Sequence, residues 1–217
     1  MKKIMKLSLV LIAIFSIMGN VCAATNNSDL NKIDVNTLKA TNIGIGGCGM
    51  LFSPSISPFD ESTLMVTSDM GGLYITHNAG KDWDRKNLEG TVEKTYFDPN
   101  KKGVLYAGGP GLYRSVDNGK TFQLIFPNEK DVIKSTYREE YNRKYLFTKS
   151  GIYPTYEVVK DILVNPNNSD NIFVLTSSGN NGKVFESKDN GENFKQIFSY
   201  QKKKCNENYY VDCNKIL

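Results

Sequence analysis

The sequence predicts an all-β fold built from repeated blades of short strands, and the main reason is a motif that occurs three times. The motif is a hydroxyl residue, any residue, Asp or Asn, any residue, Gly, two further residues and an aromatic. Its copies are Thr76–Trp83, Ser115–Phe122 and Ser187–Phe194. Before each copy, the chain shows a proline turn, an apolar strand, a glycine-bearing turn and a second strand, always in this order. Repeats of this length with several short strands are typical of propeller blades.

Each copy of the motif predicts a tight hairpin turn. An Asp or Asn side chain accepts hydrogen bonds from nearby backbone N–H groups, and glycine adopts the positive φ that such a turn requires. The closing aromatic begins the next strand and packs into the core. We therefore expect the motif residues to be structural. They are Thr76, Asn78, Gly80 and Trp83 in the first copy, Ser115, Asp117, Gly119 and Phe122 in the second, and Ser187, Asp189, Gly191 and Phe194 in the third.

This motif resembles the Asp-box (BNR) repeat of sialidases, sortilin-type receptors, photosystem assembly factors and xyloglucan-cleaving glycoside hydrolases. The resemblance implies blades of four antiparallel strands. It also implies that the box joins the third strand to the fourth at the blade periphery, away from the ligand face. Because a four-stranded blade takes about 40 to 45 residues, residues 42–217 predict about four blades and thus an incomplete or open propeller.

Residues 1–23 have the pattern of a secretory signal peptide. Three lysines precede an apolar run of about a dozen residues, and Val21-Cys22-Ala23 offers a small-residue cleavage site, with Ala24 as another end. A lipoprotein attached at Cys22 and an uncleaved N-terminal anchor are the alternatives. Residues 24–41 predict a polar N-terminal tail in which 33–38 is a candidate strand. We therefore expect a secreted or periplasmic protein without membrane contact after cleavage.

The charge and the cysteine content limit the kinds of ligand and partner that the sequence favours. The chain has 27 basic and 23 acidic residues, and removing the three lysines of the leader leaves a nearly neutral protein, which does not favour nucleic acid. The run Lys202–Lys204 is interpreted as a solvated loop. Cys205 and Cys213 could close a small disulfide loop, which leaves Cys48 unpaired. With one histidine, His77, expected to be exposed, we predict no metal site and no cofactor.

Catalytic chemistry is best sought in residues 42–74. This region resembles the first blade of glycoside hydrolase family 74, in which an Asp-x-Gly-Gly-x-Tyr segment follows a glycine-rich loop and a proline turn. The resemblance places the catalytic base at Asp69 and makes Gly46, Gly47, Gly71 and Gly72 candidate substrate-binding residues. It implies a polysaccharide substrate such as xyloglucan or β-glucan.

The position of Asp69 supports this interpretation independently. It follows the apolar segment 64–67, so its carboxylate is expected at a strand end, and the adjacent glycines would let a sugar ring approach the backbone. An inverting glycosidase also needs a second carboxylic acid roughly 6.5–9.5 Å away. In family 74 that acid comes from a second propeller, and this sequence has no counterpart to assign. The other interpretation of Asp69 is a turn aspartate that caps its own loop.

Two functions are therefore compatible with the sequence. One is a piece of an inverting endo-glycosidase that carries the base side of the site and is inactive by itself. The other is a non-catalytic secreted propeller that binds a carbohydrate or an extracellular protein. A sialidase is excluded, because none of the four arginines has the Arg-Ile-Pro context of its substrate-binding triad.

The repeat is interrupted near residues 127–160. Gly80 and Gly119 are 39 residues apart, whereas Gly119 and Gly191 are 72 apart. The extra residues predict either an insertion over the ligand face or a divergent half-blade built from 145–148 and 151–153. Tyrosines in this region are candidates for stacking on sugar rings; they are Tyr137, Tyr141, Tyr153 and Tyr156. After Phe198 the pattern ends, and residues 200–217 are a candidate start of another blade.

Overall fold

The computed structural model describes residues 49–69, 72–88, 90–138, 143–149, 158–178, 180–205 and 208–212. The chain divides into two units, 1–42 and 43–217, and all described residues belong to the second unit. Several residues singled out above lie outside the described part. They are the leader, the polar tail, Gly46, Gly47, Cys48, Gly71, Tyr141, Tyr153, Tyr156 and Cys213.

Regular structure in the described residues is β-strand throughout, apart from one short 3-10 turn, η1 (Glu129–Asp131). This confirms the predicted all-β fold. Among these residues, no helix has the length and apolar character needed to cross a bilayer.

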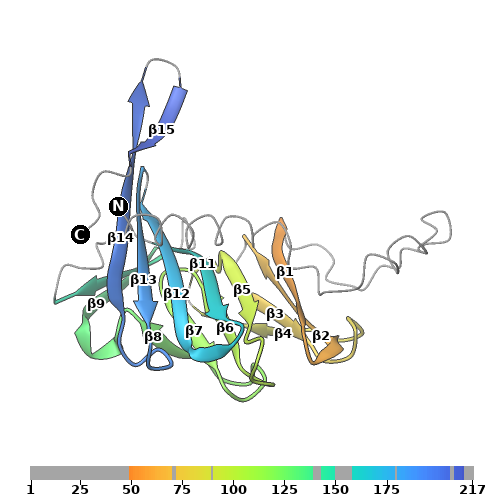
Figure 1. Ribbon diagram of the computed structural model, residues 1–217. Helices are drawn as coiled ribbons and strands as arrows, with labels where there is room; N and C mark the ends of the chain where they lie inside the picture. The colour runs from red at the N-terminus through yellow and green to blue at the C-terminus, as the bar shows by residue number, and fades with distance from the viewer. Residues whose placement is uncertain are drawn as a thin grey trace, which may run out of the picture. The chain divides into compact units, whose positions relative to one another are not determined.

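The first two blades are four-stranded antiparallel sheets, and their strands follow one another in chain order (Figure 1). Blade 1 contains β1 (Leu51–Ser57), β2 (Asp60–Ser68), β3 (Leu73–Thr76) and β4 (Asp84–Lys86). Blade 2 contains β5 (Lys94–Phe97), β6 (Leu105–Gly108), β7 (Leu112–Ser115) and β8 (Gln123–Phe126). Four antiparallel strands per blade is the architecture that the sequence predicts.

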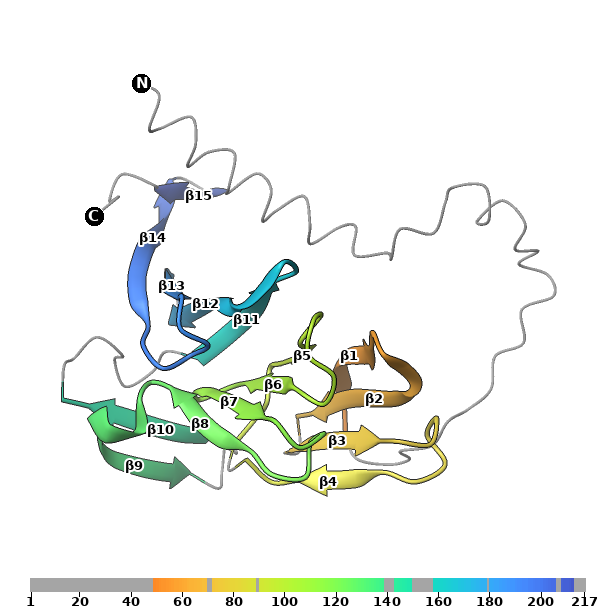
Figure 2. The ribbon, with the colours of Figure 1, turned by 60° about the horizontal axis from the view of Figure 1, so that its bottom comes forward.

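The third blade has five strands, in the order β11 to β15. They are β11 (Val158–Asn165), β12 (Asn168–Ser178), β13 (Asn181–Ser187), β14 (Lys195–Cys205) and β15 (Asn208–Asp212). In the chain between blades 2 and 3, β9 (Val132–Arg138) and β10 (Arg143–Thr148) form a two-stranded sheet, which Figure 2 shows beside β8. The expected count of about four blades thus corresponds to three full sheets and one two-stranded sheet in the described residues.

The two-stranded sheet occupies the region where the repeat is interrupted. Residues 145–148 of the predicted half-blade lie in β10, and their described partner is β9 rather than the segment 151–153, which lies outside the described residues. Tyr137 lies in β9 and is 48% exposed.

Two hydrophobic clusters join neighbouring blades, and alternating residues of the strands supply them. The first cluster lies between blades 1 and 2. It contains Met65, Leu73, Ile75, Val92, Phe97, Leu105, Ala107 and Tyr113. The second lies between blades 2 and 3. It contains Tyr106, Leu112, Ile125, Phe126, Val159, Ile162, Val164, Ile172, Val174 and Phe185. Each blade is therefore stabilised chiefly by the blade beside it.

Two expectations about the C-terminal part of the chain are wrong. Lys202–Lys204 lie in strand β14 and not in a solvated loop. Among the described residues after Phe198, 208–212 form β15, which pairs with β14 and adds a fifth strand to blade 3 instead of beginning a new blade. The ladder between β13 and β14 reaches Gln201, and the rest of β14 pairs only with β15. Strand β15 contains Tyr209, Tyr210 and Val211, and tyrosine and valine favour strands.

Candidate functional site

The three copies of the sequence motif, named here repeat turns 1, 2 and 3, have one hydrogen-bond pattern. They join β3 to β4, β7 to β8 and β13 to β14. In each turn the hydroxyl oxygen accepts the backbone N–H of the glycine four residues later, at 2.9, 2.8 and 2.9 Å. The same hydroxyl donates to the Asp or Asn Oδ1 at 2.9, 2.7 and 2.8 Å. That oxygen in turn accepts the N–H four residues beyond the Asp or Asn, at 2.9 Å in each copy.

The backbone of each repeat turn has positive φ at two successive residues. The glycines have φ of 84°, 82° and 86°, and the residues before them, Ala79, Asn118 and Asn190, have φ of 56°, 63° and 58°. The sequence pattern anticipated the glycine but missed the residue before it. The N–H of this preceding residue donates to the hairpin that joins the first two strands of its own blade, at 2.8, 2.9 and 2.9 Å. Each repeat turn is thereby fixed to its blade.

Hydrogen bonds hold the turn aspartates in the ionised form. The Asn193 side-chain amide, then its backbone N–H and the Ser187 hydroxyl, lower the pKa of Asp189 to about 2. The Thr121 hydroxyl, followed by its N–H and the Ser115 hydroxyl, lowers the pKa of Asp117 further. A carboxylate that is stabilised in this way does not exchange protons near neutral pH. This favours a structural role for both residues.

The aromatics that close repeat turns 2 and 3 pack as the motif predicts. Phe122 lies against the cluster between blades 1 and 2, and Phe194 lies against the cluster between blades 2 and 3. The Phe194 ring meets Phe126 edge-on at a centroid distance of 5.0 Å. Trp83, the aromatic of repeat turn 1, is half-buried.

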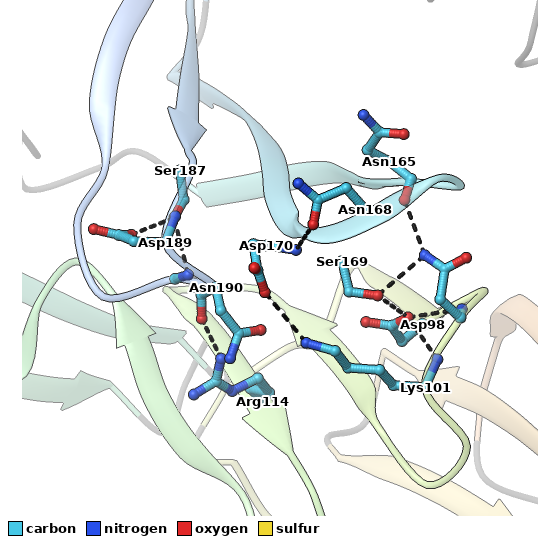
Figure 3. A network of polar contacts seen from close by, with 12 residues as sticks. Asp98, Lys101, Arg114, Asn165, Asn168, Ser169, Asp170, Ser187, Asp189 and Asn190 are labelled. Atoms are coloured by element: carbon cyan, nitrogen blue, oxygen red, sulfur yellow. Dashed lines mark hydrogen bonds and ion pairs between the residues drawn. The ribbon is translucent and has the colours of Figure 1, made fainter.

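Sequence reasoning missed Asp98, a carboxylate with 0% exposure that bridges blades 2 and 3. Its Oδ1 accepts the N–H groups of Asn100 and Lys101 at 2.8 and 2.9 Å, and the Ser169 hydroxyl of β12 at 2.7 Å. Its Oδ2 accepts the Tyr106 hydroxyl at 3.5 Å, and burial, together with the Asp98 charge, raises the pKa of Tyr106. Figure 3 shows Asp98 with Lys101 and Ser169 from close by.

The proline turns carry a sequence signal for Asp98. Ser57, Asp98 and Asn165 each precede a proline, and each accepts the N–H two residues later, at 3.2, 2.8 and 2.9 Å. Of these three equivalent residues, only Asp98 has a carboxylate, which can accept more hydrogen bonds than the turn itself supplies. Ser169 is the donor that blade 3 provides.

Asp69 lies in the turn between β2 and β3, and its side chain is exposed. Its Oδ1 accepts the N–H of Met50 at 2.9 Å, and its own N–H donates to the Met50 carbonyl at 3.2 Å. The carboxylate is therefore held at the start of β1, at the end of blade 1 opposite repeat turn 1. This contact agrees with a capping role and also fixes the orientation of the carboxylate.

Gly72, the described member of the predicted sugar-binding glycines, packs within its own blade. It has φ of +100°, and an added Cβ would lie 3.0 Å from the Lys86 carbonyl oxygen and 3.2 Å from Arg85 Nε. Strand β4 therefore accounts for the glycine without any sugar.

Two crossed ion pairs lie between the first strands of blades 2 and 3. Lys94 Nζ lies 3.0 Å from Asp161 Oδ1, and Lys160 Nζ lies 3.0 Å from Glu93 Oε1. Glu93 precedes β5, and its N–H donates to the Gly108 carbonyl at the end of β6. These pairs therefore lie at the end of their blades that corresponds to the position of Asp69 in blade 1.

His77 is exposed, as expected, and it contacts the next blade. Its Nδ1 lies 3.3 Å from the Thr63 hydroxyl and 3.4 Å from Asn118 Nδ2 of repeat turn 2. In the described part of the chain, no three His, Cys, Asp or Glu side chains are grouped so that they could hold a metal ion.

Taken together, the sheets and turns define an all-β protein with propeller-type blades. No protein-family model matches the chain, and no curated protein matches it.

Solved structures with a similar arrangement include two members of glycoside hydrolase family 74. The Xanthomonas campestris xyloglucanase is 17% identical, with a TM-score of 0.47 over 67% of this chain and 23% of that one. The Niastella koreensis enzyme is 19% identical, with a TM-score of 0.35 over 67% of this chain and 29% of that one. YCF48 from Cyanidioschyzon merolae is 17% identical, with a TM-score of 0.47 over 72% of this chain and 39% of that one. This chain thus spans well under half the length of each of these three.

Proposed function

We propose that this chain belongs to a secreted Asp-box propeller that binds chains of β-glucan or xyloglucan at the end of the blades where Asp69 lies. In this proposal Asp69 is the general base of an inverting hydrolysis. The observation that carries it is an exposed carboxylate at a strand end whose orientation is fixed by the Met50 N–H at 2.9 Å. The predicted leader 1–23 supports secretion.

The chemistry assigned to Asp69 is proton removal from water. The carboxylate accepts the proton while the oxygen of the water attacks the anomeric carbon, and a general acid protonates the leaving sugar oxygen. The hydrogen bond from Met50 restrains rotation of the carboxylate, which reduces the cost of positioning the water.

A second candidate, a non-catalytic binding propeller, is favoured by a different observation. Glu93 and Asp161 are the carboxylates at the corresponding end of blades 2 and 3, and each forms an ion pair with a lysine at 3.0 Å. A carboxylate that is paired with a lysine is better suited to form part of a fixed polar surface than to act as the general acid of a hydrolysis. Such a surface would take a carbohydrate or an extracellular protein.

The full chain with its leader removed is tested for release of reducing sugar from xyloglucan and β-glucan. The variants are Asp69→Asn and Asp69→Ala, with Asp84→Asn as the control, because Asp84 is an exposed aspartate of β4. Where a general acid is also present, loss of the base lowers hydrolysis about 10²- to 10⁴-fold and the control keeps wild-type activity, whereas a base-side piece alone releases no sugar in any variant. Measurable release that is equal in the Asp69 variants and the wild type would remove Asp69 from the site.

Affinity electrophoresis in gels that contain xyloglucan separates the two candidates. Retardation of the wild type without sugar release is expected of the non-catalytic propeller and also of an inactive base-side piece, so weaker retardation of the Asp69 variants than of Asp84→Asn is the result that favours the Asp69 face. If the protein shows no retardation and releases no sugar, a polysaccharide partner is refuted, and an extracellular protein partner is what remains. Secretion is tested by N-terminal sequencing of the exported protein, which should begin at residue 24 or 25.

A further inference from the structure

A pocket of about 320 Å³ lies between blades 2 and 3, beside repeat turn 3. It is lined by Arg114 of β7, by residues of β8 and η1, and by Gly191 and Glu192 of repeat turn 3. This places it at the end of the blades opposite to the strand end that Asp69 marks in blade 1. It is therefore separate from the face assigned in the proposed function.

One residue that lines the pocket departs from the repeat. Ile75 and Arg114 occupy the same position, since each directly precedes the hydroxyl residue of its repeat turn and pairs with the second strand of its blade. In blade 1, Ile75 Cδ1 lies 2.4 Å from a Cβ built on Gly119, so the isoleucine fills the space under repeat turn 2.

In blade 2 an isoleucine again lies under the turn, because Ile125 Cδ1 is 2.9 Å from a Cβ built on Gly191. Arg114 adds a polar contact beside it: its Nη1 lies 3.6 Å from that Cβ and donates a hydrogen bond to the Asn190 carbonyl (Figure 3). A guanidinium group has five N–H donors, so the bonds to Asn190 and to the Tyr106 hydroxyl leave it the capacity for others.

The charges of the lining residues identify the class of ligand. Arg114 and Lys130 are positive, Glu129 and Glu192 are negative, and Gln123 is a neutral amide that both donates and accepts. The Asn128 amide is bonded to the Glu192 carbonyl and the Lys130 N–H. Because the formal charges cancel, a simple anion or cation would meet as much repulsion as attraction. A sugar ring carries neighbouring hydroxyls that each donate and accept, so it can use both kinds of group, and its bonds to the charged ones are the stronger ones.

We propose that this pocket binds one neutral sugar residue of a glycan chain, as a site distinct from the Asp69 face. A volume of about 320 Å³ is at the lower end of ordinary ligand pockets and suits a single ring. The choice of a glycan rests on the proposed function, whereas the existence of the pocket does not.

The test uses the full chain labelled with ¹⁵N and titrated with cellotetraose. Binding at the pocket shifts the amide resonances of Gly191 and Glu192 in a saturable way. Arg114→Ile installs the residue that blade 1 carries at this position, so the fold is retained, the guanidinium donors of the pocket are removed, and the apparent affinity at Gly191 falls at least about tenfold. Glu192→Ala trims an exposed turn residue and lowers the affinity in the same direction. Lys120→Ala, at the equivalent position of repeat turn 2, leaves it unchanged.

The outcomes separate this proposal from the proposed function. Shifts at Gly191 without shifts at Ser68 and Asp69 support the pocket and count against the Asp69 face, and the reverse pattern overturns the pocket. Shifts at Gly191 that survive both Arg114→Ile and Glu192→Ala also overturn it. The proposal is likewise overturned if free lysine shifts the Gly191 resonance and cellotetraose does not, because the pocket would then select a zwitterion.

Discussion

Substituting Gly119 by alanine tests how closely blades 1 and 2 are packed. Gly119 has φ of +82°, and an added Cβ would lie 2.4 Å from Ile75 Cδ1, whose side chain is buried with 1% exposure. The left-handed backbone costs an alanine about 1–2 kcal/mol. Forcing a methyl group into the packed contact adds about 1–3 kcal/mol. Gly119→Ala should therefore reduce the free energy of unfolding by about 2–5 kcal/mol.

Gly103→Ala is the matched control. Gly103 has nearly the same backbone, with φ of +80°, but the nearest atom to an added Cβ is 3.7 Å away, which is ordinary contact. This variant bears only the backbone cost of about 1–2 kcal/mol. The difference between the two variants measures the overlap with Ile75.

Urea denaturation of the full chain, followed by circular dichroism, provides the free energies. Ile75→Val removes Cδ1 and alone costs about 0.5–1.5 kcal/mol. Because it removes the atom that an alanine at Gly119 would strike, the double variant should be more stable than the sum of the two single effects predicts. The reasoning is refuted if Gly119→Ala costs no more than Gly103→Ala, or if the effects of Gly119→Ala and Ile75→Val simply add.

Three further predictions follow from the turns and the blade interface. Ser115→Ala removes the acceptor of the buried Gly119 N–H and should cost about 1–3 kcal/mol in the same denaturation assay, and an unchanged midpoint would contradict this. Asp98→Ala deprives several buried donors of their acceptor, so its cost should be at least about 3 kcal/mol, measured in the same way, and a loss under 1 kcal/mol would show that the bridge is not needed. Hydrogen bonds lower the pKa of Asp189 and Asp60 to about 2 from 3.8, so the stability that these groups contribute is present above about pH 4 and lost as the pH falls towards 2. Acid titration of the unfolding midpoint checks this, and the Asp60→Asn variant should show a shallower loss than the wild type.

The repeat turns could be predicted from sequence because their geometry is local. The hydroxyl, the Asp or Asn and the glycine bond to one another within about one turn of chain, so their spacing alone specifies the hairpin. The same local logic explains why the third and fourth strands of each blade were placed correctly. Propensity, turn chemistry and hydrophobic alternation all favour one structure here.

Features that depend on contacts between distant residues could not be predicted. Lys202–Lys204 have the composition of a solvated loop, and only their pairing with β15 makes them a strand. The resemblance to a sugar-binding turn predicted that Gly72 lies beside a sugar, but β4 occupies the space next to it. The buried bridge between Asp98 and Ser169 joins residues 71 positions apart, and no window along the sequence contains both.

The comparison of the two blade interfaces shows where function is best sought in this repeat. Both interfaces contain an apolar cluster, which supplies most of the favourable burial. At the outer position the first interface has Ile75 against Gly119, and the second has Ile125 against Gly191 with Arg114 bonded to Asn190 beside it. A partly buried arginine adds little net stability at such a position. The repeat can tolerate this because its blades share the same backbone hydrogen bonds. Residues that depart from an otherwise repeated pattern without a gain in stability, such as Arg114 and the exposed Asp69, are therefore the strongest candidates for contacts with a ligand.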